Sequence, residues 1–237
     1  MTSGTSGRLF APSDWDGVRL VAFDMDGTLY SQYRLRLRMM RDILFDAAAK
    51  RTLDTIIVLR TYRRIRELLA DREAADFDNA LADETARSTG RASHQVRSIV
   101  EEWIERRPLP YLKACRYPRL AELFAGLRRQ GKAIGILSDY PAGAKLAALG
   151  LKADHIVCAN DDGIGLLKPN PRGLGALIEA AGTTPHQTVL IGDRPDRDGE
   201  AARRMGAWPL IKSASPIKDW QTFVAFDDAI FSTLLQA

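Results

Sequence analysis

The chain has 237 residues, of which 46% are hydrophobic and 27% charged, with a formal net charge of +4. These values are typical of an ordinary soluble globular protein. No apolar run approaches the roughly 20 residues that cross a bilayer, and no secretory signal pattern opens the sequence. We therefore expect a cytoplasmic protein without a membrane partner, and a flexible leader over residues 1–17, which begin with MTSGTSG.

Short apolar runs predict buried strands that alternate with helical stretches. Strands of this kind, connected by helices, form a parallel sheet that is covered on both faces. We therefore predict an α/β fold with a Rossmann-like, doubly wound parallel sheet. The expected strands lie at residues 18–23, 132–137, 155–159 and 188–192, with a shorter one at 208–211.

The interval between the first two strands has helical periodicity instead. Leu37, Met40, Leu44 and Ala47 fall on one helical face, although alternation over residues 33–39 also leaves a short extended piece open. We predict an all-helical inserted domain over residues 32–110. The core domain then comprises residues 18–31 and 111–237.

Polar residues follow several of the predicted strands. The first strand leads into Asp24, Asp26, Gly27 and Thr28. Because parallel strands of a doubly wound sheet end at one edge, these residues are expected to meet there with others from later in the chain. Those others are Ser138 and Asp139 in ILSDY, Lys168 in LLKPNP, and Asp193 and Asp198 in GDRPDRD.

This set of side chains suits phosphoryl transfer. The carboxylates of Asp24, Asp26 and Asp193 form a hard-oxygen site suited to Mg²⁺, while Lys168 and Ser138 can hold phosphate oxygens. Transfer of a phosphoryl group needs charge neutralisation and in-line positioning. One carboxylate acts as nucleophile and another handles the proton of the leaving group.

Four segments, DMDGTLY, ILSDY, LLKPNP and GDRPDRD, closely resemble in order the motifs of the haloacid dehalogenase-like (HAD) hydrolase superfamily, most of whose members are phosphatases. The resemblance implies a helical cap of the C1 type over residues 32–110. It also implies that Asp24 forms an aspartyl-phosphate and binds Mg²⁺, and that Asp26 is the general acid and base with its backbone carbonyl on the metal.

The resemblance extends to the remaining site residues. Ser138 would bind the phosphate, Lys168 would stabilise Asp24 and the transferring group, and Asp193 would complete the metal site. Asp198 would bind a metal water or orient Lys168, with Asp196 as a competing candidate. Phosphate contacts are also expected from the group Asp24, Gly27, Thr28 and Asp139.

These residues imply a phosphatase that hydrolyses a small phosphate monoester, similar to phosphoglycolate or a sugar phosphate. Asp26 argues against a dehalogenase, because a leaving halide needs no proton. Lys50 is the only lysine between residues 31 and 110, which disfavours a phosphonatase with a lysine Schiff base. A phosphosugar mutase or other phosphotransferase stays open, since it would use the same core residues.

Substrate contacts outside the motifs are expected from Tyr30, Tyr33 and Arg34. The neighbouring Arg36 and Arg38 are further candidates for a second anionic group on the substrate. These residues follow the first motif, so they belong to the start of the cap or lie just before it.

Residues 86–100 allow an alternative of another class. Ala86, Gly90 and Val96 have the spacing of a helix-turn-helix, with the second helix expected from Ser93 to Arg106. A DNA- or protein-binding role is therefore open. The acidic residues Glu101, Glu102 and Glu105 weaken the DNA interpretation, and a turn between two cap helices explains the glycine equally well.

Overall fold

The computed structural model describes residues 9–236 and contains a six-stranded parallel sheet with strand order β3-β2-β1-β4-β5-β6. The five predicted strands are present, and a short sixth strand was not predicted. The strands are β1 (Leu20–Asp24), β2 (Ala133–Ser138), β3 (His155–Cys158), β4 (Thr188–Gly192), β5 (Trp208–Lys212) and β6 (Thr222–Phe223). The Rossmann-like fold class is thereby confirmed.

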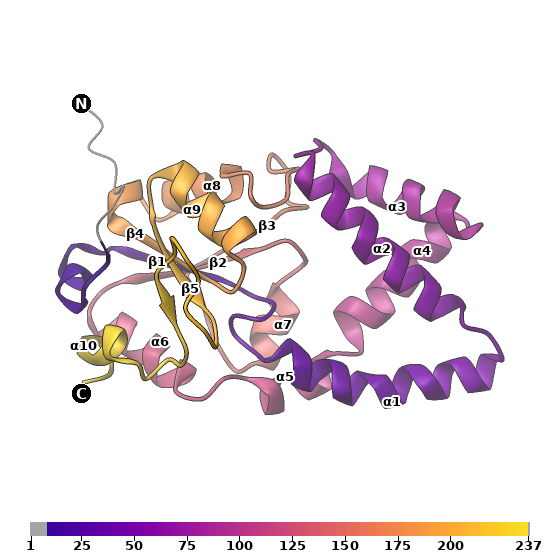
Figure 1. Cartoon of the computed structure of the whole chain (residues 1–237), viewed down its shortest axis with the longest axis horizontal. Helices are drawn as coiled ribbons and strands as arrows, with labels where there is room; N and C mark the ends of the chain where they lie inside the picture. Colours follow the sequence, from indigo (N-terminus) through magenta and orange to yellow (C-terminus); the bar gives the residue numbers. More distant parts are fainter. Residues whose placement is uncertain (1–8, 237) are drawn as a thin grey trace.

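Both faces of the sheet are covered by helices (Figure 1). Val21 and Phe23 of β1 belong to the core cluster on one face, which also holds Phe124 of α6 (Leu120–Arg129). The intervening Leu20 and Ala22 belong to the cluster on the other face, with α8 (Arg172–Ala180) and α9 (Glu200–Met205). This alternation is why the strand is apolar at every position.

Three further helices complete the part of the core that the structure describes. They are α5 (Leu109–Cys115), α7 (Gly143–Ala148) and α10 (Ser232–Leu235). Cys115 and Cys158 are buried free thiols. No helix among residues 9–236 is long and apolar enough to cross a membrane.

The N-terminal segment departs from the expected flexible leader in its described part. Residues Pro12–Gly17 form a 3₁₀ helix, and Phe10 and Trp15 are only 3% and 1% exposed. The Trp15 indole N–H donates to the carbonyl of Ile230 at 2.6 Å. Residues 9–17 therefore pack on the core, because two aromatic side chains bury more apolar area than a solvated leader would. Residues 1–8 lie outside the described part.

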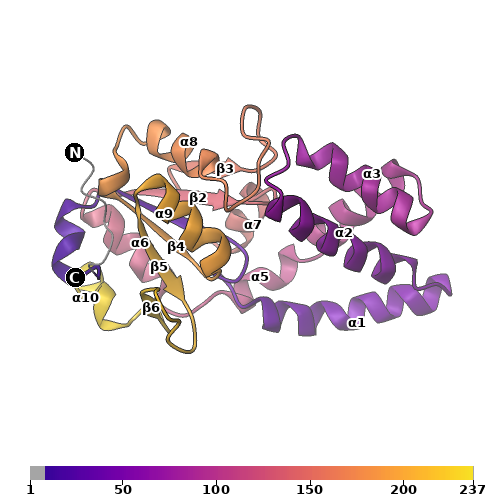
Figure 2. The same cartoon turned by 45° about the horizontal axis from the view of Figure 1, so that its top comes forward.

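Helices α1 to α4 form a separate bundle beyond the sheet (Figures 1 and 2). Their bounds are α1 (Gln32–Lys50), α2 (Asp54–Asp71), α3 (Phe77–Thr89) and α4 (Ser93–Val100), which continues as a π-helix over Glu101–Arg106. They bury an apolar cluster that includes Val58, Ile65, Leu81, Val96 and Trp103 and extends to Ala159 and Leu167 of the core. Residues 33–39 are helical, so the extended alternative for that piece is not adopted.

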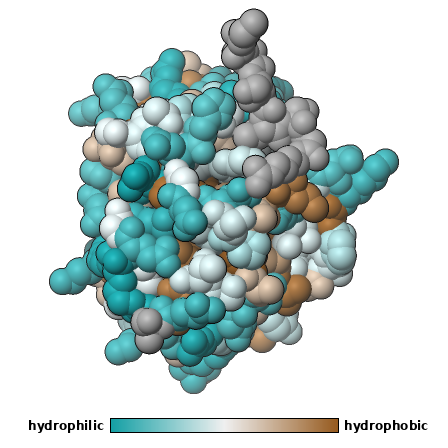
Figure 3. All heavy atoms as spheres, turned by 90° about the vertical axis from the view of Figure 1, so that its left-hand side faces the viewer, coloured by the Kyte–Doolittle hydropathy of each residue, from teal (hydrophilic) through white to brown (hydrophobic). Residues whose placement is uncertain are grey.

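Helix α1 leaves an apolar face uncovered. Leu37, Met40 and Leu44 are 50%, 50% and 57% exposed. Most of the exposed large hydrophobic residues in the described chain lie between residues 33 and 68. By contrast, Figure 3 shows that the opposite end of the molecule is predominantly hydrophilic, with small hydrophobic patches. The periodicity of α1 correctly predicts a helix, but not a buried face at these three positions.

The segment considered as a helix-turn-helix forms a turn inside this bundle. Gly90 ends α3 with a positive φ of 66°. Arg97 of α4 donates to Asp78 at 2.6 Å and to Asn79 at 2.9 Å, and the Ser93 hydroxyl donates to Asp83 at 2.6 Å. The polar start of α4 is therefore bound to α3.

Candidate active site

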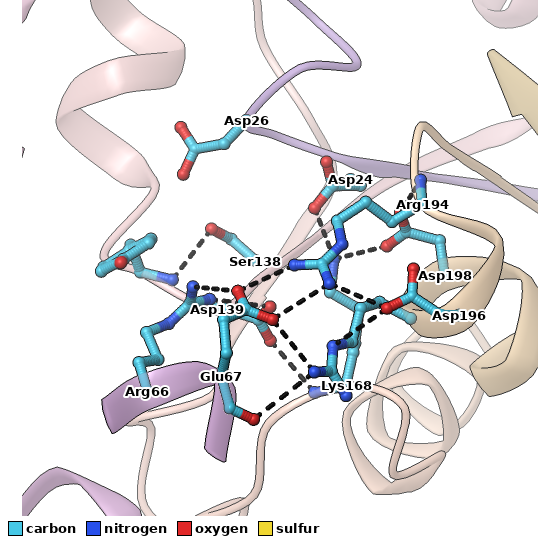
Figure 4. A network of polar contacts seen from close by, with 12 residues as sticks. Asp24, Asp26, Arg66, Glu67, Ser138, Asp139, Lys168, Arg194, Asp196 and Asp198 are labelled. Atoms are coloured by element: carbon cyan, nitrogen blue, oxygen red, sulfur yellow. Dashed lines mark hydrogen bonds and ion pairs between the residues drawn. The ribbon is translucent and has the colours of Figure 1, made fainter. Parts of the chain in front are cut away.

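The carboxyl ends of neighbouring strands bring the predicted motif residues to one edge of the sheet. Asp24 is the last residue of β1, Ser138 the last of β2, and Asp193 follows β4 directly. Since β1 lies between β2 and β4, these three residues come from the ends of adjacent strands. Figure 4 shows Lys168 and Asp198 beside Asp24 in the same polar network.

Three carboxylates form an acidic group that can hold a cation. Oxygens of Asp24, Asp193 and Asp198 all lie within 4.8 Å of one another. Burial raises the pKa of Asp24 well above its ordinary value, with Lys168 opposing and the two neighbouring carboxylates adding to the increase. Burial and Asp198 likewise raise the pKa of Asp193 to about 6. A divalent cation would relieve this repulsion, so the donor set fits Mg²⁺.

Lys168 is the cation that balances this group. Its side chain is 4% exposed, and its Nζ contacts the Asp24 carboxylate and donates to Asp198 Oδ1 at 2.6 Å. Burial alone would lower the pKa of Lys168, but Asp198 and Asp24 outweigh it and the pKa is raised. The ammonium therefore stays charged beside the Asp24 carboxylate.

Asp26 stands apart from the acidic group, as Figure 4 shows. Its carboxylate accepts from the Tyr30 hydroxyl, and from Lys145 Nζ at 3.0 and 3.2 Å. Burial acts to raise the pKa of Asp26, but Lys145 and the Tyr30 hydrogen bond more than offset it, so the pKa is lowered. Its backbone carbonyl, the atom expected on the metal, accepts from Gln32 at 2.8 Å.

The turn after β1 is shaped around these carboxylates. The Thr28 hydroxyl, fully buried, donates to Asp24 Oδ2 at 3.0 Å and orients it. Gly27 has a φ of +103°, and a Cβ there would lie 2.2 Å from Asp193 Oδ2. Only glycine therefore lets the turn pass this close to the carboxylate that follows β4.

Ser138 and Asp139 lie where the second motif was expected to act. Ser138 is 2% exposed, and its Oγ accepts from the backbone N–H of Tyr140 at 3.2 Å. Asp139 accepts from the backbone N–H of Lys168 at 3.1 Å and pairs with Arg66 of α2 at 2.9 Å. Asp139 thus ties the second and third motifs together and contacts the helical bundle.

A cavity of about 660 Å³ lies between the strand ends and the facing sides of α1 and α2. Its lining includes Asp24, Asp26, Lys168 and Tyr30. The structure does not bring all of the predicted substrate residues there. Arg34 is exposed and outside the lining, and so is Tyr33, with 71% of its surface exposed.

Several residues at this site were missed by the sequence analysis. Lys145 lies seven residues after Ser138, with no pattern that marks it. Arg194 and Arg197 belong to the fourth motif segment and bind Glu67 of α2, at 2.8 and 3.0 Å. The competing candidate Asp196 pairs with Arg194 at 2.8 Å, is 61% exposed, and lies outside the acidic group.

At the carboxyl edge of the parallel sheet, three carboxylates can hold a divalent cation, and the buried lysine can hold an anionic group of a substrate. Residues 18–206 match the family model for haloacid dehalogenase-like hydrolases. The chain belongs to this hydrolase family, as its four motif segments indicated.

Named relatives place the chain with the phosphatases of the family. It is 28% identical over 218 residues to a phosphoglycolate phosphatase of Rhodospirillum rubrum, covering 89% of this chain and 87% of the relative. It is also 28% identical over 137 residues to a phosphoserine phosphatase of Thermus thermophilus, covering 56% and 53%. The prediction of a phosphatase-type enzyme is thereby confirmed.

Solved structures support the fold. A haloacid dehalogenase from Pseudomonas syringae superposes with a TM-score of 0.63 at 18% identity, covering 92% of this chain and 98% of that one. At this identity the likeness concerns the fold alone.

Proposed function

We propose that the protein is a Mg²⁺-dependent phosphatase that hydrolyses a small phosphate monoester through an aspartyl-phosphate at Asp24. The observation that carries this proposal is the buried contact of Asp24 with Lys168 inside an acidic group that fits a divalent cation. The phosphoglycolate phosphatase relative supports a substrate similar to phosphoglycolate, and a sugar phosphate is the other candidate.

The residues present can carry both halves of the reaction. In the first, an Asp24 carboxylate oxygen attacks phosphorus and the ester bond breaks. The leaving alkoxide takes a proton from Asp26, which has received that proton from the phosphate hydroxyl of the monoanionic ester. In the second, water attacks the aspartyl-phosphate, gives its proton to Asp26 and releases phosphate. The ionised state in which Lys145 and Tyr30 hold Asp26 suits this second step.

Side chains held in place by the core would bind the negatively charged phosphoryl group. Lys168 and the Ser138 hydroxyl would bind phosphoryl oxygens, and Thr28 holds Asp24 in place. Asp24, Asp193 and Asp198 would hold Mg²⁺, together with the Asp26 carbonyl. When bound, the cation supplies neutralisation of the phosphate charge, as in other phosphoryl-transfer sites.

The proposed function also assigns a role to the helical bundle. We propose that residues 32–110 form a cap that closes over a core of residues 18–31 and 111–237. The cap would exclude water and provide the substrate contacts that the core lacks.

Release of phosphate from p-nitrophenyl phosphate tests the reaction class. We expect turnover with Mg²⁺, none with excess chelator, and none for Asp24→Asn, which keeps the shape but removes the nucleophilic charge. Asp26→Asn should lose about 10²- to 10⁴-fold, the usual contribution of general acid–base catalysis. No turnover by folded wild type, on this ester or on a panel of sugar and acid phosphates, would contradict the proposal and favour the phosphotransferase alternative.

A further inference from the structure

The cavity is larger than a two-carbon acid phosphate requires. Its volume of about 660 Å³ falls within the range of sites for drug-sized ligands, about 300 to 1,000 Å³. The phosphate-binding groups occupy only the end at the sheet edge. The remainder extends between α1 and α2, so the side chains of these two helices that line the cavity decide which leaving groups fit.

Apolar side chains form much of this extension. Met39 and Ile43 of α1 line it from one side, and Leu59 of α2 from the other. Trp103, which is 4% exposed, contributes from the π-helix that follows α4. A wall of this kind is suited to hydrocarbon or ring surface, and not to the several hydroxyl groups of a sugar.

Two arginines on α2 interrupt the apolar wall. Arg60 and Arg63 line the same cavity, six and three residues before Arg66 respectively. At about 1.5 Å of rise per residue, Arg63 and Arg60 lie about 4.5 and 9 Å further along the helix axis than Arg66. Arg66 itself pairs with Asp139, which accepts from the backbone N–H of Lys168. Arg63 and Arg60 therefore lie about one and two helical turns away from the phosphate-binding end of the cavity.

The charges of these two arginines are not matched within the described part of the chain. Apart from Arg36, the other cations of the cavity have carboxylate partners: Arg194 and Arg197 bind Glu67, Lys145 binds Asp26, Lys168 binds Asp24, and Arg66 binds Asp139. Among residues 9–236, neither Arg60 nor Arg63 has an ion-pair or hydrogen-bond partner for its side chain. Among the same residues, the Arg36 guanidinium has the Gln32 amide oxygen as its one partner, at 2.6 Å.

We infer that the substrate is an extended phosphate monoester whose leaving group has an apolar middle and a second anionic group, bound by Arg60 and Arg63. This inference rests on the proposed phosphatase function and narrows its substrate class. The second anion is a carboxylate or a phosphate, since guanidinium groups bind both through paired N–H donors. It lies further from the ester than the carboxylate of phosphoglycolate does.

A matched series of esters tests this inference. The compounds are phosphoglycolate, the phosphate ester of hydroxyhexanoate, n-hexyl phosphate, and hexanediol bisphosphate. We expect kcat/KM for the hexanoate ester or the bisphosphate to exceed that for n-hexyl phosphate and that for phosphoglycolate by about tenfold or more, the value of one charge-assisted contact. Whichever of the two is preferred identifies the second anion.

Variants then assign the preference to the two arginines. The double variant Arg60→Gln and Arg63→Gln should reduce the advantage of the preferred compound over n-hexyl phosphate by about tenfold. Arg64→Gln is the matched control, because Arg64 is an exposed arginine on the same helix outside the cavity lining, and it should keep the advantage. Equal reductions in the double variant and the control would overturn the inference.

Two other results would overturn it as well: equal rates for n-hexyl phosphate and its charged counterparts, or a preference for phosphoglycolate. Failure of the proposed function is separable from these outcomes. If no ester is hydrolysed, calorimetric titration of wild type and the double variant with the non-hydrolysable phosphonate analogues still measures the preference for the second anion. Tighter binding of the charged analogue that the double variant loses would support the inference without any turnover.

Discussion

Single residues set the chemistry of this site by dividing two adjacent carboxylates between different partners. Asp24 lies with Lys168 inside the acidic group, whereas Asp26, two residues later, turns to Lys145 and Tyr30. Burial and like charges raise the pKa of Asp24, and a cation partner lowers that of Asp26. Residues that would repel each other in an ordinary strand end are thereby separated by their environments.

Gly27 offers a test at this scale. A Cβ at this position would overlap the Asp193 carboxylate, and the residue that carries it would have to adopt a φ of +103°. We expect Gly27→Ala to displace Asp193 and to lower kcat/KM by about 100-fold, as misplacements of about 1 Å do in active sites. Phosphate release and Mg²⁺ titration measure the effect.

Gly143→Ala is the control for this substitution, because nothing lies within 4 Å of a Cβ there. It should leave both quantities unchanged. Wild-type turnover and Mg²⁺ dependence in Gly27→Ala would mean that the turn adapts, and that Asp193 does not depend on the close approach.

At the scale of elements, α2 is the helix that joins the bundle to the reaction edge. Its C-terminal half carries Glu67, which binds Arg194 through both oxygens at 2.8 and 3.0 Å and Arg197 at 3.0 Å. Both arginines belong to the segment that holds Asp193 and Asp198. The C-terminal half of α2 therefore holds the bundle against the segment that carries two of the three acidic residues.

This contact predicts a pH dependence of stability. Burial acts to raise the pKa of Glu67, but hydrogen bonds from Arg194 and Arg197 lower it to about 2, against an ordinary value of about 4.3. A lowered folded-state pKa stabilises the fold above the ordinary pKa, and the stabilisation is lost as the pH falls toward 2. The melting temperature of wild type should exceed that of Glu67→Gln at pH 7, and the difference should shrink below about pH 4.3.

Glu84→Gln on α3 provides the comparison, because Glu84 has no ion pair among the described residues. Its melting temperature should track wild type across the same pH range. A wild-type advantage over Glu67→Gln that stays constant down to pH 3 would show that the charge of Glu67 is not its source.

At the scale of the whole molecule, the two parts of the chain enclose the site without burying every apolar face of the bundle. The core holds the acidic group in place through the sheet, and the bundle reaches it through α2. Since the acidic group is repulsive without a cation, the molecule as a whole is expected to be more stable when the cation is bound.

Metal removal tests this expectation. Mg²⁺ at about 100 times its dissociation constant should add about 2.7 kcal/mol to the free energy of unfolding, which corresponds to roughly 5 to 10 °C in melting temperature for a chain of this length. Asp193→Asn should lose most of this increase. An increase of the same size in Asp193→Asn, or none in wild type, would place the cation elsewhere or exclude it.

Much of the fold and of the core site follows from local sequence. Apolar runs of four to six residues between helical stretches leave few alternatives to a parallel sheet, and such a sheet gathers strand ends at one edge. Asp24, Ser138 and Asp193 were therefore predictable as neighbours. Strand β6 has only two residues, Thr222–Phe223, and so lacks a run that a pattern can detect.

Other features were decided only by tertiary structure, because they depend on contacts between residues far apart in the chain. Lys145 meets Asp26 across 119 positions, and Glu67 meets Arg194 across 127, with no local pattern to mark either pair. The periodicity of α1 correctly predicts its helix, but which side faces the cavity depends on where α2 packs. The sequence alone thus determined the fold and the motif residues at the sheet edge, while the packing of the bundle decided which arginines line the cavity.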